Sequence, residues 1–93
     1  MDNILIIDDE KSLLDLLTVV FKKEGYGVKT ALSAAKAFEV LDKDDIDLVI
    51  SDIKMPGEID GIGLYEWVLR ERPGLGERFL FVWGFGRDPN CRR

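Results

Sequence analysis

Four short apolar runs are spaced along the chain, and the first three are each followed by a stretch with helical periodicity. Residues 4–7, 47–50 and 79–83 form runs that are apolar throughout except for Asp47 at the start of the second, whereas residues 26–31 form a weaker, mixed run. Continuous runs without polar alternation are typical of strands that are covered on both faces, as in a parallel sheet between helices. The mixed run is typical of an edge strand.

Three segments between these runs carry apolar residues at helical spacing. The inward positions predicted for the first helix are Leu13, Leu16, Leu17, Val20 and Phe21, and Gly25 stands where a C-terminal cap belongs. Ser33 is the predicted N-cap of the second helix. Its inward stripe is Ala34, Ala37, Phe38 and Leu41. The third is predicted from about Ile62 to Arg72, ending before Pro73-Gly74. Its inward positions are Ile62, Tyr65, Val68 and Leu69, which leaves Trp67 outside the stripe.

Strands that alternate with helices of this length predict βαβ units with right-handed crossovers, and hence an α/β fold. The chain has 93 residues, which is enough for one small domain and too few for two. We find no internal repeat and no low-complexity segment.

The composition excludes several classes of function. The chain carries 13 basic and 18 acidic residues, a net charge of −5, which argues against direct binding to nucleic acid or to an anionic membrane. It contains no histidine, so histidine metal ligands, histidine-activated nucleophiles and a phosphohistidine are excluded. Cys91 is its only cysteine, and no apolar run is long enough to span a membrane. We therefore expect a cytoplasmic protein.

Acidic residues follow two of the predicted strands. Asp8 and Asp9 come directly after the first run, and Asp52 follows the run at 47–50. The carboxyl ends of parallel strands meet at one edge of the sheet, where α/β proteins place their ligand sites. Two unit charges 4 Å apart repel by about 4 kcal/mol at an effective dielectric constant of 20. Three carboxylates there predict a site for a hard cation, Mg²⁺ first.

Each acid also has a plainer interpretation. Asp8 or Asp9 could cap the helix that begins near Glu10, where a negative charge is favoured by the helix dipole. Asp52 alone could be a solvated acid at a strand end. The combination of all three at one edge favours the cation site.

The chain resembles the receiver domain of two-component response regulators, over about residues 3 to 86. The segments that carry the resemblance are Ile4-Leu5-Ile6-Ile7-Asp8-Asp9-Glu10, Asp47-Leu48-Val49-Ile50-Ser51-Asp52-Ile53-Lys54-Met55-Pro56-Gly57 and Asp60-Gly61. The resemblance implies a flavodoxin-like, doubly wound parallel sheet. The family's sheet has five strands in the order 2-1-3-4-5, and here we expect about four, in the order 2-1-3-4, with three helices.

The same resemblance implies a function. Asp52 matches the aspartate that accepts a phosphoryl group from a histidine kinase or phosphotransfer protein. Asp9 and Asp52 would bind Mg²⁺ through their side chains and Lys54 through its backbone carbonyl, with Asp8 assisting through water. Such a domain catalyses at most its own phosphorylation and dephosphorylation, so it is not an enzyme in the turnover sense.

The sequence departs from the family at three points. The loop of residues 56–61 is one residue longer than usual, which a loop absorbs at little cost. Trp83 stands where the family has a threonine or serine. The chain also ends before the fifth strand and its lysine, so we interpret residues 1–86 as an incomplete receiver domain and 87–93 as an irregular tail. We expect Mg²⁺ binding to survive and switching to be weak; a fragment of a longer regulator is an alternative.

Two other functions compete with phosphotransfer signalling. The fourth strand, residues 79–83, would be an exposed apolar edge, which predicts self-association, most simply as a dimer. A module that acts only through such contacts, without phosphorylation, is the first alternative. The second is a Mg²⁺-dependent phosphohydrolase, which is disfavoured because Lys54 stands where a second acid would be needed.

Overall fold

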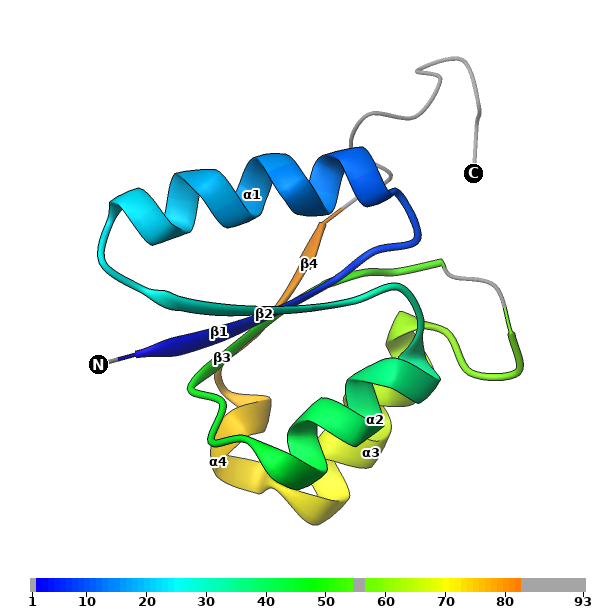
Figure 1. The fold of residues 1–93 in the computed structure, drawn as a ribbon. Coiled ribbons are helices and arrows are strands. Elements are labelled where there is room, and N and C mark those ends of the chain that lie inside the picture. The colour runs from blue at the N-terminus through cyan, green and yellow to red at the C-terminus, as the bar shows by residue number, and fades with distance from the viewer. Residues whose placement is uncertain (1, 55–56, 83–93) are drawn as a thin grey trace.

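A computed structural model of the protein describes residues 2–54 and 57–82. Their centre is a parallel sheet with the strand order β2-β1-β3-β4 (Figure 1). The strands are β1 (Asn3–Ile7), β2 (Gly27–Ala31), β3 (Leu48–Asp52) and β4 (Phe79–Val82). The predicted α/β class and the order 2-1-3-4 are confirmed. The predicted last strand residue, Trp83, and the predicted tail 87–93 lie outside the described residues.

Helices cover both faces of the sheet. They are α1 (Lys11–Lys23), α2 (Ala34–Lys43), α3 (Gly61–Glu71) and α4 (Pro73–Gly76). Helix α1 lies on one face, and the other three lie on the opposite face (Figure 1). The short α4 was not predicted: Pro73 ends α3 as expected but also begins a new turn, because its fixed φ suits the first position of a helix. Among the described residues, no helix is long and apolar enough to cross a membrane.

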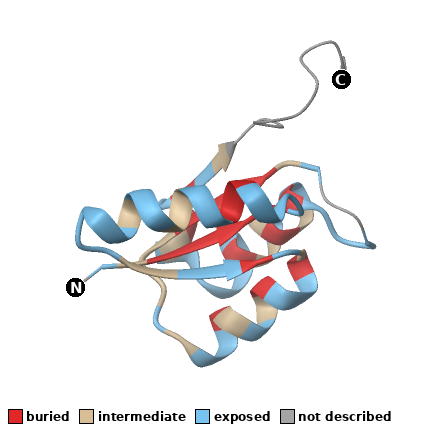
Figure 2. Cartoon of the chain, turned by 45° about the horizontal axis from the view of Figure 1, so that its top comes forward, coloured by how far each residue is buried: buried red, intermediate tan, exposed pale blue. Residues whose placement is uncertain are grey.

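The core consists of two apolar layers, one on each face of β1. Ile4 and Ile6 pack with Ile50 and with Leu14 of α1. Leu5 and Ile7 face the other layer, whose remaining buried members are Ala31, Ala34, Ala37, Leu41, Val49, Leu64, Val68 and Phe79. Figure 2 shows the buried residues concentrated in the central strands. The continuous apolar run of residues 4–7 is therefore explained by burial on both faces.

The predicted helix caps are present. The Ser33 hydroxyl oxygen accepts a hydrogen bond from the Lys36 N–H at 3.3 Å, which caps α2. Gly25 follows α1 with φ at +96°, a conformation that favours glycine, and lets the Tyr26 N–H bond to the Phe21 carbonyl at 3.2 Å. The predicted inward stripe of α2 is also correct, since Ala34, Ala37 and Leu41 are buried and Phe38 packs against the core.

The predicted inward face of α1 is partly wrong. Leu16 and Val20 are exposed, at 55% and 45%, whereas Leu14, which the prediction omitted, is buried. Apolar residues occupy more than half the circumference of this helix, so periodicity alone does not decide which side is covered. The isoleucines of β1 and β3 decide it, because they take Leu14, Leu17 and Phe21 as their partners.

The predicted inward face of α3 also needs correction. Of the predicted positions, Val68 is buried and Tyr65 packs against the core, but Ile62 and Leu69 are exposed. Leu64, which the prediction omitted, is buried. Trp67, expected outside the stripe, packs against the core layer with its ring 5.0 Å from that of Phe38. The first residue of the helix, Gly61, lies close to the end of β3, where an added Cβ atom would collide with the Asp52 carbonyl oxygen.

Candidate functional site

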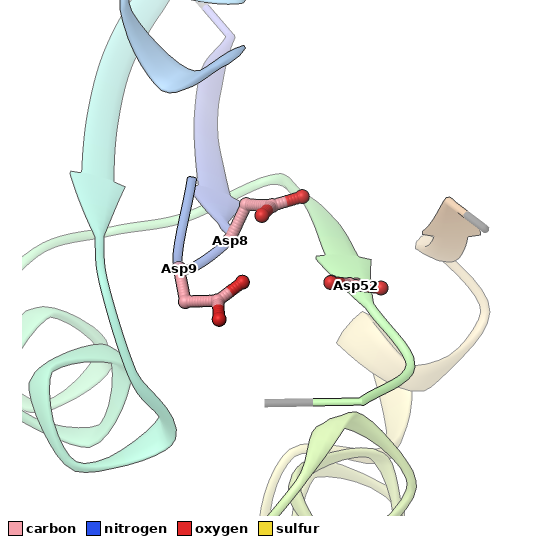
Figure 3. Close-up of side chains that lie close together, drawn as sticks. All are labelled: Asp8, Asp9 and Asp52. Carbon is pink, nitrogen blue, oxygen red and sulfur yellow. The ribbon is translucent and has the colours of Figure 1, made fainter. Parts of the chain in front are cut away.

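The acidic site forms where β1 and β3 end side by side. In their parallel register Ile7 lies opposite Ser51, so the next residues, Asp8 and Asp52, meet at the same edge. Asp9 follows in the turn before α1, and its carboxylate points towards the same space (Figure 3). The structure therefore brings together the three acids that the sequence singled out.

The three carboxylates are close enough to share one ion. One oxygen from each of Asp8, Asp9 and Asp52 lies within 4.8 Å of the other two. Asp8 and Asp52 are buried, with 3% and 2% of their surface exposed, whereas Asp9 is exposed. A ligand could thus enter from the side of Asp9, while the other two acids form the floor of the site.

Asp8 does not occupy the N-cap position of α1. The N-cap residue of α1 is Glu10, and it makes no side-chain capping hydrogen bond. The Asp8 carboxylate instead accepts a hydrogen bond from the Glu10 N–H at 2.9 Å, one residue before the helix begins. The Asp8 N–H donates to the Ala31 carbonyl of β2 at 3.1 Å. The first bond orients the Asp8 carboxylate, and the second holds the Asp8 backbone at the strand end.

Gly61 lies directly against the backbone of Asp52, a contact that the sequence alone did not reveal. The Gly61 N–H donates to the Ile53 carbonyl at 2.8 Å, and a Cβ atom at Gly61 would collide with the Asp52 carbonyl oxygen. Asp60 caps α3 by accepting a hydrogen bond from the Gly63 N–H at 3.0 Å. The pair Asp60-Gly61 thus starts α3 directly against the backbone of the candidate phosphoacceptor. In the sequence this pair is visible only as part of the family pattern, because a close backbone approach leaves no periodic signal.

Burial and neighbouring charge perturb the site. Burial raises the pKa of the Asp8 carboxyl to about 6, and the negative charges of Asp52 and Asp9 add to this, while the bond from Glu10 opposes it. An acid whose pKa is raised by neighbouring acids lies in a site that favours added positive charge. Because every side chain in the cluster offers only oxygen, a hard divalent cation suits the donors.

Comparison with known proteins decides the family. The sequence model described as "Response regulator receiver domain" matches residues 4–80. The chain belongs to this family. The transcriptional regulatory protein GlrR of Escherichia coli is 41% identical over 82 residues, and regulatory protein VanR of Enterococcus faecium is 46% identical over 56. These matches cover 88% and 60% of this chain but only 18% and 24% of those proteins, so this receiver chain spans about a fifth of their length.

Solved receiver structures share the fold. A receiver domain from Methanospirillum hungatei superposes with a TM-score of 0.83 at 31% identity, covering 90% of this chain and 65% of that one. The response regulator TrrA of Thermotoga maritima, solved in complex with Mg²⁺-BeF, gives a TM-score of 0.74 at 34% identity, covering 78% and 63%. Receiver domains bind Mg²⁺ at an acidic pocket, and this receiver has an acidic cluster.

Two predicted site positions are not placed by this geometry. Lys54 lies in the exposed segment after β3, and its role as a carbonyl ligand stays a prediction. Trp83, in the position of the family's threonine or serine, lies outside the described residues, as do Met55 and Pro56 of the loop after Asp52.

The raised pKa of Asp8 predicts how stability depends on pH without a divalent cation. Between its ordinary pKa of 3.8 and about 6, the folded protein binds this proton more tightly than the unfolded chain, so stability falls as pH rises through this range. We expect Asp8→Asn to raise the free energy of unfolding near neutral pH by about 1–3 kcal/mol and to flatten the dependence.

Urea unfolding in EDTA at about pH 4.5 and about pH 7.5 measures this effect. Asp15→Asn is the matched control, because Asp15 is exposed and paired with Lys11 at 3.3 Å, so its loss should change stability by less than about 1 kcal/mol. If the two variants changed the free energy of unfolding equally at both pH values, the raised pKa of Asp8 would be contradicted.

Proposed function

We propose that this receiver domain binds Mg²⁺ at the Asp8–Asp9–Asp52 cluster and accepts a phosphoryl group on Asp52 from a histidine kinase or a phosphotransfer protein. The observation that carries the proposal is the convergence of three carboxylates within 4.8 Å at the carboxyl edge of the sheet. The Mg²⁺-BeF complex of the Thermotoga maritima relative supports it.

The residues of the site suit this chemistry. The side chains of Asp9 and Asp52 and the carbonyl of Lys54 would hold the ion, and Asp8 would act through a bound water. When bound, Mg²⁺ neutralises the acids and the incoming phosphoryl oxygens, so that an anionic nucleophile can approach phosphorus. The Asp52 carboxylate then forms the new O–P bond while the P–N bond to the donor histidine breaks and the imidazole keeps the electron pair. The protein catalyses only this modification of itself and its reversal.

Phosphorylation of Asp52 is testable with a small donor. Incubation with acetyl phosphate and Mg²⁺ should add one phosphoryl group, seen by intact mass, and Asp52→Asn should abolish the adduct. Asp9→Asn should slow its formation by at least about tenfold, because a cation ligand is lost. The exposed Asp15→Asn serves as the control and should behave as the unaltered protein. An adduct that persists in Asp52→Asn, or no adduct at all in the unaltered protein, would contradict the proposal.

Switching is proposed to be impaired because Trp83 replaces the hydroxyl residue of the family. An indole offers only an N–H donor and is far bulkier than a threonine. A hydroxyl hydrogen bond contributes about 1 kcal/mol, whereas driving a two-state switch from 1:99 to 99:1 takes about 5.5 kcal/mol, so its loss weakens the response.

Restoring the hydroxyl tests this part of the proposal. Amide spectra recorded with and without beryllofluoride and Mg²⁺ should show changes confined to the site in the unaltered protein. In Trp83→Thr the changes should spread to β4 and α3. Trp83→Phe controls for the loss of bulk alone and should resemble the unaltered protein. Widespread changes already present with Trp83 would refute impaired switching.

Exposed apolar surface favours a second candidate function, an interaction module that works without phosphorylation. Within the described residues β4 is an edge of the sheet, and its Leu80 is 55% exposed. Leu80 lies opposite Ile50 in the register and therefore on the α1 face, where Leu16 and Val19 are also exposed. An apolar edge strand is a template for pairing with a second copy.

Light scattering after gel filtration tests this self-association. We expect a dimer at tens of micromolar, and Leu80→Lys should shift it to monomer by placing a charge on the edge. Thr30→Lys, an exposed position on the opposite edge strand β2, is the control and should leave the dimer intact. A monomer at every concentration, or a dimer that Leu80→Lys does not affect, would exclude pairing through β4.

A further inference from the structure

A groove runs between α2 and α3 on the face of the sheet opposite α1. The two helices lie side by side (Figure 1), and Phe38 of α2 meets Trp67 of α3 edge to face, with ring centroids 5.0 Å apart. The groove holds about 720 Å³. We call it the α2–α3 groove, with an apolar floor of Phe38, Ile59 and Trp67 and a charged rim of Glu39, Asp42, Glu71 and Arg72.

The apolar side chains of the floor are partly exposed to the groove, and Ile59 packs against α3. Phe38 and Trp67 are half-buried, so part of each ring faces the groove, and Ile59 is 40% exposed. Ile59 lies directly over Gly63, where an added Cβ would stand only 2.9 Å from its Cγ2 atom. A second hollow of about 350 Å³ continues the groove past Phe38 and Ile59 towards the start of α2. None of these side chains belongs to the acidic site.

The rim of the groove is mainly acidic, which favours a positively charged partner. Three carboxylates face one guanidinium along the groove, and Glu58 adds a fourth acid in the continuing hollow. The acidic rim residues are exposed and accessible to a partner, and Glu39 is the one that also lies near a lysine of its own helix, 4.0 Å from the Lys36 ammonium. An apolar floor between acidic rims is complementary to an amphipathic segment with an aliphatic face and basic flanks.

We propose that the α2–α3 groove binds a cationic amphipathic helix of a partner protein. Helix α2 has ten residues and is thus about 15 Å long, which matches about three turns of a docked helix. Large aromatic side chains at the centre of such a groove, here Phe38 and Trp67, are typical anchors for apolar partner residues. A second copy of this chain is disfavoured as the occupant of this groove, because its net charge of −5 would be brought against the acidic rim, whereas pairing through β4 uses a different surface.

Binding is tested by titrating the ¹⁵N-labelled protein with a synthetic helical peptide of leucine and lysine, with leucine on one face. The indole N–H signal of Trp67, assigned from its absence in Trp67→Phe, should shift together with the amides of α2 and α3. A peptide with glutamate in place of lysine should produce no shift. If the lysine peptide leaves the Trp67 signal unmoved at millimolar concentration, the proposal is overturned.

Charge variants show whether binding is specific to the groove. Asp42→Lys with Glu71→Lys should weaken peptide binding by at least about tenfold, since two attractive rim charges become repulsive. Glu24→Lys with Glu77→Lys makes the same change in net charge outside the groove and should weaken binding by less than about threefold. All four positions lie at helix C-terminal ends, where lysine is favoured, so folding should be preserved. Equal effects of the two pairs would overturn the proposal.

A third variant tests the floor. Ile59→Ser changes an exposed loop residue and should weaken peptide binding severalfold without lowering the melting temperature. An unchanged affinity would contradict a role for the apolar floor. Unlabelled protein that reproduces the Trp67 shift when added in place of the peptide would identify a second copy as the occupant and overturn the cationic partner.

Discussion

Repulsion between the carboxylates at the ends of two adjacent strands is the interaction on which the acidic site depends. The parallel register of β1 and β3 delivers Asp8 and Asp52 to one edge, and the turn before α1 adds Asp9. Two of the three acids are buried; burial raises the pKa of Asp8, and the neighbouring charges of Asp52 and Asp9 raise it further. A proton on Asp8 or a cation between the acids relieves the repulsion. The two functions proposed for this edge are cation binding and phosphoryl transfer. Both depend on the concentrated negative charge of the three carboxylates, which favours binding of a cation.

The surroundings keep the acids in place. The Asp8 carboxylate accepts a bond from the Glu10 N–H and its backbone donates to β2, and Gly61 lets α3 begin directly against the Asp52 backbone. The two helical faces carry the surfaces of the other two proposals. One carries the exposed edge residue Leu80 beside α1, and the other carries the α2–α3 groove with Trp67 in its floor. Exchange of a phosphoryl group and contact with partners are thus assigned to separate surfaces of one small sheet.

The sequence was sufficient for the sheet and the acids, because both depend on local patterns. An uninterrupted run such as residues 4–7 indicates a strand buried on both faces, and an acid after such a strand lies at its carboxyl edge. The covered sides of α1 and α3 were predicted incorrectly at Leu16 and Ile62, since these helices are apolar around much of their circumference. The approach of Gly61 to β3 and the packing of Trp67 on the core are tertiary contacts, which leave no periodic signal in the sequence.

The most direct test of the account is the position of a bound divalent cation. A crystal of the protein soaked in Mn²⁺, which scatters anomalously and substitutes for Mg²⁺ on oxygen ligands, locates the ion without reference to any activity. The account predicts one strong anomalous peak bounded by the carboxylates of Asp9 and Asp52 and by the Lys54 carbonyl, with Asp8 one water away. A site without such a peak, or with Asp52 turned away from Asp9, would contradict it.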